Sequence, residues 1–522
     1  MSGNAASLPS ILGPIRPRPR GRESRLLAIV AITILVGSVS LELAKRVTDP
    51  GESQGLSPAN PLHLAIYLGL IGIAHLVLIL SGRRMDQILL PATAMLGGIS
   101  LLLMERLPQT QVVQTVGPWK LGLGDIQLAW LILSFSLATI LAVTVRSDRW
   151  LRLYKYTWAA AGVGLLVATY FLGDDINGQR LSLSLGPLSG QPAELLKVIL
   201  VVFLAGYLSE YRPLLVEEST KVGPISLPPL PFLAPMVAMW AIALGLVVVQ
   251  RDLGAALLFF SVFLSLLYAA TGRVGYVVVG VVLFLAGSFV MYHLVPTVQT
   301  RVDIWLDPFK SASGDGYQIV QSLYAFARGG LLGTGLGAGL PTVGGNLPIP
   351  AIHTDFPLAA LGEELGFVGV MAILGLFLVV VERGLRIAAS AADEFRALLA
   401  AGLALVIGTQ ALIIAAGNLK LIPLTGITLP FISYGGSSLL VNGIIVGLLL
   451  ALSDRGVEPP PPPRPRGRLA RLTGRVTRLE SPSGARAPLP SSARAPLPSR
   501  ARAPQPPARA PLPPAPTGDG EP

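Results

Sequence analysis

Long, nearly uninterrupted apolar runs dominate the hydrophobic pattern of this chain, as in residues 26–43 and 274–295. A membrane-spanning helix needs about 20 mainly apolar residues to cross about 30 Å of hydrocarbon. Twelve stretches are long enough, and short connections near residues 251 and 272, which could be kinks, leave this count open by one or two. The runs begin near Leu26, Leu62, Gln87, Asp125, Tyr156, Pro192, Pro231, Leu253, Val274, Phe356, Ala397 and Gly436. The pattern predicts an all-α polytopic bundle of about 10–12 transmembrane helices.

The composition supports this prediction, because 52% of the 522 residues are hydrophobic and only 13% are charged, whereas a soluble domain carries roughly 25% charged residues. The mean hydropathy is +0.63. Residues 1–25 carry a net charge of +4 and residues 454–522 a net charge of +7, which together account for the whole excess of +11. The basic excess therefore belongs to the two ends of the chain, and we predict no nucleic-acid partner. The absence of cysteine excludes disulfides, thiolate metal sites and thiol nucleophiles.

Basic residues indicate the orientation of the helices, because Lys and Arg accumulate in short cytoplasmic loops. Arg83 and Arg84 follow the second run, a basic group at 146–155 follows the fourth, and Arg383 and Arg386 follow the tenth. With an even number of spans, all of them lie on the same side as the two basic ends. We therefore predict that both termini are cytoplasmic and that residues 296–355 form a large external loop. The first run lacks a small-residue cleavage site and is predicted to be an anchor.

Three parts follow from this organisation: a basic cytoplasmic tail at 1–25, a transmembrane domain at 26–453 that includes the external loop 296–355, and a Pro- and Arg-rich cytoplasmic tail at 454–522. The last part repeats Ala-Arg-Ala-Pro-Leu-Pro from residues 485, 493 and 508. Such a sequence cannot bury a core and is predicted to be disordered. Contact with anionic lipid head groups is one interpretation of this tail, and a low-complexity extension without a specific partner is the other.

Polar and ionisable residues at membrane depth are costly and mark pathways or sites. In a first cluster, Arg180 follows two aspartates, and Gln191 precedes an apolar helix that carries Glu194 and Lys197. Glu194 and Lys197 are three residues apart, so they share a helix face and can neutralise each other; an interfacial salt bridge would have the same pattern. A second cluster places Asp252 between two long apolar runs, where a plain loop is the alternative.

A third cluster occupies the segment 296–355. Arg301, Asp307 and Asp315 precede Gln318 and Gln321, and a glycine-dense stretch follows at 329–345. Long loops in compact proteins are usually functional or disordered. The aromatic and carboxylate content of this segment favours a function.

The same segment leads into His353, Thr354 and Asp355, which precede the next apolar run. Adjacent carboxylates, Glu363 and Glu364, then stand just inside that apolar helix. Titratable groups thus continue from the loop into the membrane domain.

The fourth cluster spans residues 429–438, where Ser433 lies among Pro430, Gly435 and Gly436. Interrupted helices are tolerated at membrane depth only where they are buried or line a wet cavity. All four clusters fall on, or next to, the external side of the predicted topology, so a single cavity open to that side is the better account. Its cations can hold an anionic head group, and its carboxylates can accept a proton from a hydroxyl. These groups fit a phosphate-bearing lipid substrate.

The order and spacing of these clusters resemble the SEDS family of peptidoglycan glycosyltransferases, the FtsW/RodA/SpoVE group. The similarity covers residues 26–453. Its motifs are Asn177-Gly178 with Arg180, Gln191-Pro192 with Glu194 and Lys197, Asp252-Leu-Gly254, Arg301 through Asp307-Pro308 to Gly316-Tyr-Gln318, His353-Thr-Asp-Phe356 with Glu363-Glu364-Leu-Gly366, and the stretch 429–438.

The resemblance implies a multi-pass protein of the bacterial cytoplasmic (inner) membrane. Its implied activity is polymerisation of lipid II, an undecaprenyl-pyrophosphate-linked substrate, into glycan strands at the outer membrane face during cell division or elongation. The implied partner is a class B penicillin-binding protein, a transpeptidase. A loop carboxylate would deprotonate the acceptor sugar's 4-hydroxyl, which displaces undecaprenyl pyrophosphate, and Arg180, Lys197 and Arg301 would stabilise that leaving group. No cofactor or metal site is implied, and a divalent cation stays an open alternative.

One position departs from the family pattern. Most members carry the proposed catalytic aspartate four residues after the position of Asp307, where this chain has Ser311. A serine hydroxyl is no general base at neutral pH without a partner. The sequence favours Asp315 as the replacement and Asp307 next, while a carboxylate elsewhere is a third alternative. A lipid II flippase and a catalytically inactive scaffold that binds a transpeptidase are the rival functions.

Overall fold

A computed structural model describes residues 17–48, 60–109, 112–116, 119–176, 179–185, 188–217, 220–222, 225–227, 252–339 and 347–454, together with scattered positions between 234 and 248. The predicted N-terminal tail is described only from residue 17, and the predicted C-terminal tail only at residue 454. Arg180 belongs to a strand whose backbone is described, but its side chain, like Asn177, Gly178 and Arg251, lies outside the described part.

The all-α prediction is confirmed, and eleven of the twelve predicted runs form a helix in the described residues; the run near Pro231 lies largely outside them. These helices are α1 (Gly21–Thr48), α2 (Pro61–Leu80), α3 (Leu89–Arg106), α4 (Leu123–Thr144), α6 (Lys155–Leu172), α7 (Pro192–Glu217), α9 (Leu253–Thr271), α10 (Val274–Leu294), α13 (Pro357–Ala389), α14 (Glu394–Asn418) and α15 (Gly436–Leu452). Nine helices of the described part are long and apolar enough to cross a membrane. Gly272, in a left-handed conformation at φ 67°, separates α9 from α10, so this connection is a turn and not a kink.

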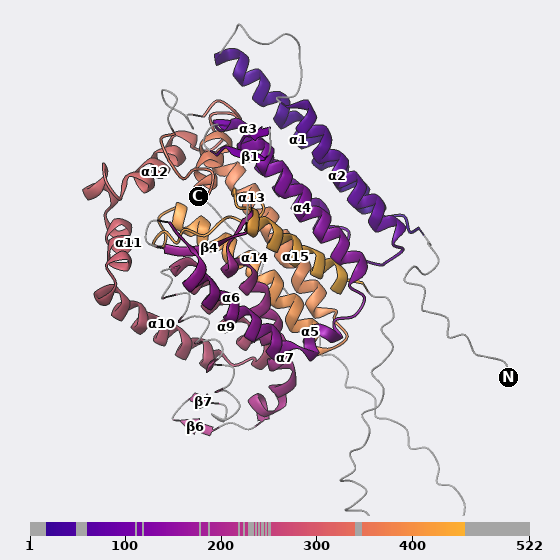
Figure 1. Ribbon diagram of the computed structural model, residues 1–522, viewed down its shortest axis with the longest axis vertical. Helices are drawn as coiled ribbons and strands as arrows, with labels where there is room; N and C mark the ends of the chain where they lie inside the picture. Colours follow the sequence, from indigo (N-terminus) through magenta and orange to yellow (C-terminus); the bar gives the residue numbers. More distant parts are fainter. Residues whose placement is uncertain are drawn as a thin grey trace, which may run out of the picture. The chain divides into compact units, whose positions relative to one another are not determined.

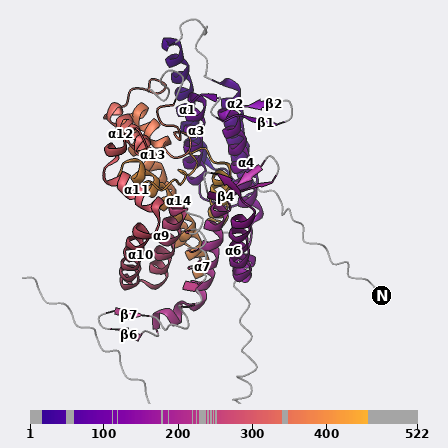
Figure 2. The ribbon, with the colours of Figure 1, turned by 60° about the vertical axis from the view of Figure 1, so that its left-hand side comes forward.

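The inner helices are α7, α9, α14 and α15, and they bring the polar segments together. Helix α14 packs against α7, α9 and α13, while α15 packs along α4. The most apolar window of α7 is 89% buried, against 6% for α10, so α7 is a central helix and α10 an outer one. Figures 1 and 2 show α1, α2 and α3 running beside α4 at one side of this group.

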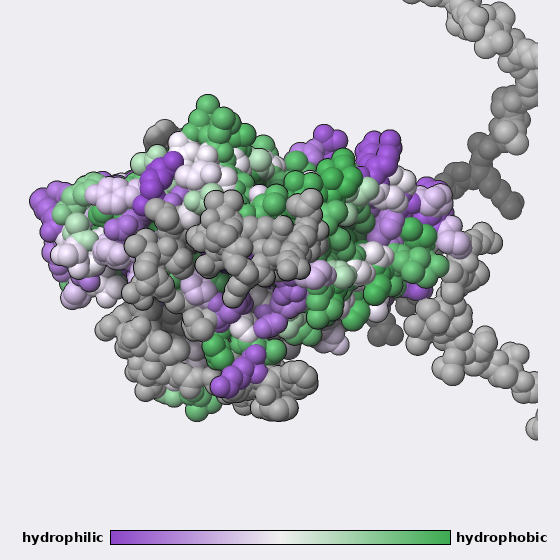
Figure 3. All heavy atoms as spheres, turned by 90° about the horizontal axis from the view of Figure 1, so that it is seen from above, coloured by the Kyte–Doolittle hydropathy of each residue, from purple (hydrophilic) through white to green (hydrophobic). Residues whose placement is uncertain are grey.

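Large apolar side chains are exposed on the outer helices, where a soluble protein would carry polar ones. Examples are Ile32 on α1, Ile73 on α2, Leu283 on α10 and Leu378 on α13, each more than 60% exposed. Figure 3 shows hydrophobic residues as extended green areas on the surface seen from above. Such surface is stable in contact with lipid tails, which agrees with a multi-pass membrane protein.

The segment 296–355, predicted as a large external loop, contains helices of its own. It contains α11 (Pro296–Leu306), the short 3₁₀ helix η2 (Pro308–Ser311) and α12 (Tyr317–Gly329). Helix α12 buries one face through Ile319, Val320 and Ala325. This amphipathic spacing is a helical signal that the loop interpretation overlooked.

Short antiparallel strands close three connections, and none of them was predicted. The strands are β1 (Gln114–Val116), β2 (Trp119–Leu121), β3 (Asp174–Ile176), β4 (Gln179–Leu185), β5 (Leu188–Gly190), β6 (Thr220–Val222) and β7 (Ile225–Leu227), and an additional short helix is α5 (Arg149–Leu153). They pair as β1–β2, β3–β4–β5 and β6–β7. Strand β5 ends directly before α7 and so leads into the first polar cluster.

The two ends of the described chain lie on the same side of the helical bundle. Arg22 at the start of α1 and Ser453 after α15 line one cavity. This arrangement agrees with an even number of crossings.

Candidate functional site

A group of buried polar side chains lies where α7, α9 and α14 meet. On the first turns of α7, Glu194 and Lys197 are 8% and 3% exposed. The Lys197 Nζ donates to Glu194 Oε2 at 2.5 Å and to the Gln410 Oε1 of α14 at 2.8 Å. The predicted ion pair is therefore present, and it is joined to a second helix.

Asp252 lies beside this pair at the N-cap of α9. Its Oδ1 accepts from the backbone N–H of Ala255 at 3.0 Å, and its Oδ2 accepts from Gln191 Nε2 at 3.3 Å. Burial raises the pKa of Asp252, and the Glu194 charge adds to this; the Ala255 N–H and the charges of Arg301 and Lys197 act in the opposite direction. Asp252, Gln191, Glu194, Lys197 and Gln410 line one cavity of about 30 Å³.

Arg301 reaches this region from α11. Its guanidinium donates to the backbone carbonyls of Leu424 and Thr425 at 3.4 and 3.2 Å. Burial lowers the pKa of Arg301, while the charges of Asp252 and Asp355 raise it. Arg301 thus lies within electrostatic range of two carboxylates that are 49 residues before it and 54 residues after it in the sequence.

Asp355 precedes α13 and is half-buried near that arginine. Burial raises the pKa of Asp355 to about 6, and the positive charge of Arg301 partly opposes the rise. The Asn418 Nδ2 donates to the backbone carbonyl of Asp355 at 2.9 Å and so fixes the segment to the end of α14. A carboxylate with a pKa near neutrality is suited to accept a proton at physiological pH.

His353, Thr354 and Ser433 hold the two interrupted segments together. Ser433 Oγ donates to the Thr354 carbonyl at 2.6 Å and accepts from the Leu429 N–H at 2.8 Å, while the Tyr434 N–H donates to the His353 carbonyl at 2.8 Å. Burial lowers the pKa of His353, which favours its neutral form. Among the described residues its buried Nδ1 has no hydrogen-bond partner.

Glu363 and Glu364 form a separate cluster with other cations. Glu363 Oε1 lies 3.0 Å from Arg328 Nε, and Glu364 Oε1 lies 3.4 Å from Arg106 Nε. Glu364 Oε2 also accepts from the Gly337 N–H at 2.9 Å. These carboxylates fasten the glycine-dense stretch to the start of α13.

The segment between α11 and α12 carries Asp307, Asp315 and Ser311. Asp307 is half-buried and its Oδ2 lies 3.4 Å from Lys310 Nζ, whereas Asp315 is exposed. Ser311 Oγ accepts from the Gly316 N–H at 3.1 Å and so closes the turn. Gln318 and Gln321 are half-buried on α12. Neither aspartate joins the buried group around Asp252.

Gln410 is the residue of this site that sequence reasoning missed. It is fully buried, accepts from Lys197, and donates through Nε2 to the Thr428 carbonyl at 2.7 Å. The available signal was a lone amide in the apolar run 403–416, because polar side chains inside spanning helices usually have a partner or a function.

The part of the chain that the structure describes contains no preformed metal-binding site. No group of three or more His, Asp or Glu side chains there is arranged to hold an ion. Lys197 and Arg301 place two positive charges in the site, beside the carboxylates of Glu194, Asp252 and Asp355.

Comparison with known proteins gives the family. A family model described as "Cell cycle protein" (FTSW_RODA_SPOVE) matches residues 87–456. The peptidoglycan glycosyltransferase RodA of Mycobacterium tuberculosis is 37% identical over 455 residues, which cover 87% of this chain and 94% of the relative. A probable peptidoglycan glycosyltransferase FtsW of a Geobacter species is 34% identical over 309 residues, 58% of this chain and 80% of the relative.

A solved structure gives the same result at the level of the fold. It is described as "Structural coordination of polymerization and crosslinking by a peptidoglycan synthase complex", and its chain aligns with a TM-score of 0.55 at 25% identity. The alignment covers 71% of this chain and 98% of that chain. Because the family model spans more than half of the sequence and a relative matches over nearly its whole length, this protein belongs to the FtsW/RodA/SpoVE family.

Proposed function

We propose that this protein is a peptidoglycan glycosyltransferase that polymerises lipid II at the outer face of the bacterial cytoplasmic membrane. The observation that carries the proposal is the convergence of Lys197 and Arg301 with Asp252 and Asp355 at one end of the apolar bundle. The names of the relatives, which are peptidoglycan glycosyltransferases, support the same reaction. Division and elongation are both compatible with it.

In the proposed reaction, the acceptor sugar's 4-hydroxyl attacks the anomeric carbon of the donor, and undecaprenyl pyrophosphate leaves. Negative charge develops on the pyrophosphate, and the cations Lys197 and Arg301, with Arg180 as a further candidate, stabilise it electrostatically. The site is held by hydrogen bonds between α7, α9 and α14, so its charges are positioned before substrate binds. The 30 Å³ cavity is too small for a disaccharide, and substrate must therefore bind over it or open it.

The base of this reaction is the carboxylate that accepts the hydroxyl proton. Asp355 fits this role best, because it is half-buried near Arg301 and its pKa is raised to about 6. Asp315 and Asp307, which the sequence favours, remain the alternatives on the neighbouring segment. Conversion of each to asparagine separates them: loss of the base lowers the rate by about 10²–10⁴-fold, and the other two variants retain most of the activity.

The decisive assay is glycan-strand synthesis from purified lipid II by the full chain, co-purified with a class B penicillin-binding protein. We infer such a transpeptidase as the partner because the aligned solved chain belongs to a complex of polymerization and crosslinking. Head-group translocation in sealed vesicles without strand synthesis would favour a flippase and refute the proposal. The same assay with a chelator tests whether a divalent cation is needed.

Ser311→Asp tests the alternative hypothesis that the protein is a catalytically inactive scaffold. An aspartate at this position can still accept from the Gly316 N–H, so the turn is expected to persist. If the natural chain is inactive and Ser311→Asp makes strands, the scaffold reading is correct. A natural chain that polymerises lipid II refutes it.

The proposed orientation places residues 296–355 outside and both termini in the cytoplasm. The chain has no cysteine, so single cysteines report on orientation without background. We expect Ser313→Cys to react with a membrane-impermeant maleimide in intact spheroplasts and Ala392→Cys to react only after lysis; both positions are exposed. The reverse pattern would refute the proposed orientation.

A further inference from the structure

A second cavity lies at the opposite end of α13 from the polar site. The site adjoins the first turn of α13, whereas this cavity is bordered by Arg383 and Arg386 on its last turns, by Arg22 on α1, and by Arg84 and Asp86 between α2 and α3. Its volume is about 550 Å³, within the range of small-molecule binding sites. We refer to it as the basic cavity.

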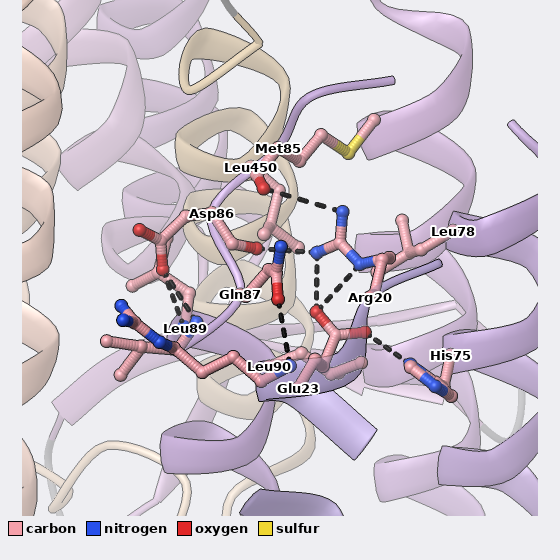
Figure 4. A network of polar contacts seen from close by, with 12 residues as sticks. Arg20, Glu23, His75, Leu78, Met85, Asp86, Gln87, Leu89, Leu90 and Leu450 are labelled. Carbon is pink, nitrogen blue, oxygen red and sulfur yellow. Dashed lines mark hydrogen bonds and ion pairs between the residues drawn. The ribbon is translucent and has the colours of Figure 1, made fainter. Parts of the chain in front are cut away.

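Hydrogen bonds hold the segment between α2 and α3, which forms one wall of the basic cavity. The buried Arg20 donates to the backbone carbonyls of Met85 and Asp86 at 3.4 and 2.6 Å, and its Nε donates to Glu23 Oε2 at 3.0 Å. Figure 4 shows this network, in which Glu23 also contacts His75 at 2.6 Å. The backbone that carries Arg84 is therefore fixed before any ligand binds.

Asp86, the single acidic residue that lines the cavity in the described residues, is already used. Its Oδ1 accepts from the N–H groups of Ile88 and Leu89 at 2.8 and 3.0 Å, and its Oδ2 accepts from Arg383 Nε at 2.9 Å. Asp86 thus caps α3 and neutralises Arg383 (Figure 4 shows it beside Leu89). It compensates none of the other arginines of the cavity.

Arg22 and Arg84 are those uncompensated arginines. Both side chains are exposed, and neither has a side-chain partner among the residues that the structure describes. Arg386 pairs with Glu382 at the surface. The two ends of the chain are themselves basic, with net charges of +4 and +7. A cavity lined by two arginines without a paired acid favours an anion as its ligand.

The surroundings indicate which kind of anion. Ile88 and Ile387 contribute apolar surface to the cavity itself. On the helices that border it, Ile29 of α1 and Leu385 of α13 are 56% and 41% exposed, as suits contact with lipid tails. A ligand with a charged group next to hydrocarbon chains would match both surfaces at once.

We propose that the basic cavity binds the phosphate group of an anionic membrane lipid, whose acyl chains lie against α1 and α13. Arginines pair with phosphate through two parallel hydrogen bonds, which gives Arg22 and Arg84 an advantage over lysines at the same place. By the proposed orientation, the lipid belongs to the cytoplasmic leaflet. The cavity is separate from the lipid II site and needs no turnover to be occupied.

The test is lipid retention by the full chain in mixed nanodiscs of phosphatidylcholine and phosphatidylglycerol, measured by native mass spectrometry. A basic residue near a membrane surface contributes an electrostatic attraction that, for two arginines, corresponds to roughly 30-fold in affinity. We expect Arg22→Gln with Arg84→Gln to weaken phosphatidylglycerol retention by about that factor. Both side chains are exposed, so the melting temperature is expected to stay unchanged.

The matched control is Arg149→Gln with Arg152→Gln on α5, which removes two exposed arginines from the same membrane face away from the cavity. Little change in the control supports the proposal, whereas equal loss in both double variants means general surface attraction and overturns it. Inorganic phosphate and an acidic peptide are added as competitors. Displacement of the lipid by inorganic phosphate at equal concentration would show that the acyl chains contribute nothing, and selective binding of the peptide would identify a protein partner; either result overturns the lipid assignment.

Discussion

The buried pair of Lys197 and Glu194 allows a stability effect to be separated from a catalytic one. Lys197→Met keeps the length of the side chain and removes its charge. The Glu194 carboxylate then stays buried without its cation at 2.5 Å, and Gln410 Oε1 loses a donor at 2.8 Å. A single substitution thus breaks the ion pair within α7 and the hydrogen bond from α7 to α14.

The size of the effect follows from the burial of both groups. Removing one partner of a buried ion pair costs about 3–5 kcal/mol, because the remaining charge is uncompensated. Replacing both partners removes that penalty, so Lys197→Met with Glu194→Gln is expected to cost only about 1–3 kcal/mol, the value for an unsatisfied buried acceptor such as Gln410 Oε1. The double variant should therefore be more stable than Lys197→Met alone.

The assay measures the free energy of unfolding in mixed micelles together with the rate of strand synthesis. If Lys197 holds the leaving pyrophosphate, the double variant recovers stability but not activity. Glu394→Gln is the control, because its pair with Arg212 is about half exposed and is expected to contribute about 0.2–1 kcal/mol. A double variant that is no more stable than Lys197→Met refutes the reasoning on burial, and one with full activity refutes the role of Lys197 in the reaction.

Further predictions concern Asp355 and Gln410 in the site and Gly366 in the neighbouring helix α13. The pKa of Asp355 is about 6. If Asp355 is the base, the rate of strand synthesis rises with pH up to about 6 and then levels off. Asp355→Asn is expected to abolish this rise in a pH–rate profile. Burial raises the pKa of Asp355 above its value in the unfolded chain. Its contribution to the free energy of unfolding is therefore full below pH 4 and falls by roughly 3 kcal/mol by pH 7. Unfolding measurements on Asp355→Asn should not show this loss. Gln410→Leu is expected to cost about 1–3 kcal/mol, since it leaves Lys197 and the Thr428 carbonyl each without one partner; an unchanged unfolding free energy contradicts this. Gly366→Ala should cost about 1–3 kcal/mol, because Gly366 has φ 67° and an added Cβ would lie 2.3 Å from the Gly333 nitrogen; Gly375→Ala, with open space around it, is the control, and equal melting temperatures would refute the strain.

The membrane helices could be predicted from the sequence because their signal is local. Each apolar run contains enough information to define one span, whereas the connection near Gly272 stayed open until the structure showed its left-handed conformation. The polar clusters were recognisable for a similar reason, since charged residues are rare within apolar stretches of sequence. The predicted topology placed these clusters together at one end of the bundle.

The contacts inside the site could not be predicted, because they depend on packing between distant helices. Arg301 and Asp252 are 49 residues apart, and only the fold brings their charges within range. Gln410 is joined to Lys197 by the packing of α14 against α7. Glu363 and Glu364 looked equivalent to the other acids in sequence, yet they pair with Arg328 and Arg106 in a separate cluster.

The break at Gly366 divides α13 into two pieces of different character. Residues 357–365 precede it, and the 23 residues from 367 to 389 follow it as the continuous helix. At 1.5 Å per residue this second piece is about 35 Å long, close to the thickness of the hydrocarbon layer of about 30 Å. Glu363 and Glu364 consequently precede the apolar helix proper, which begins only after the bend, and Arg328 and Arg106 compensate their buried charges.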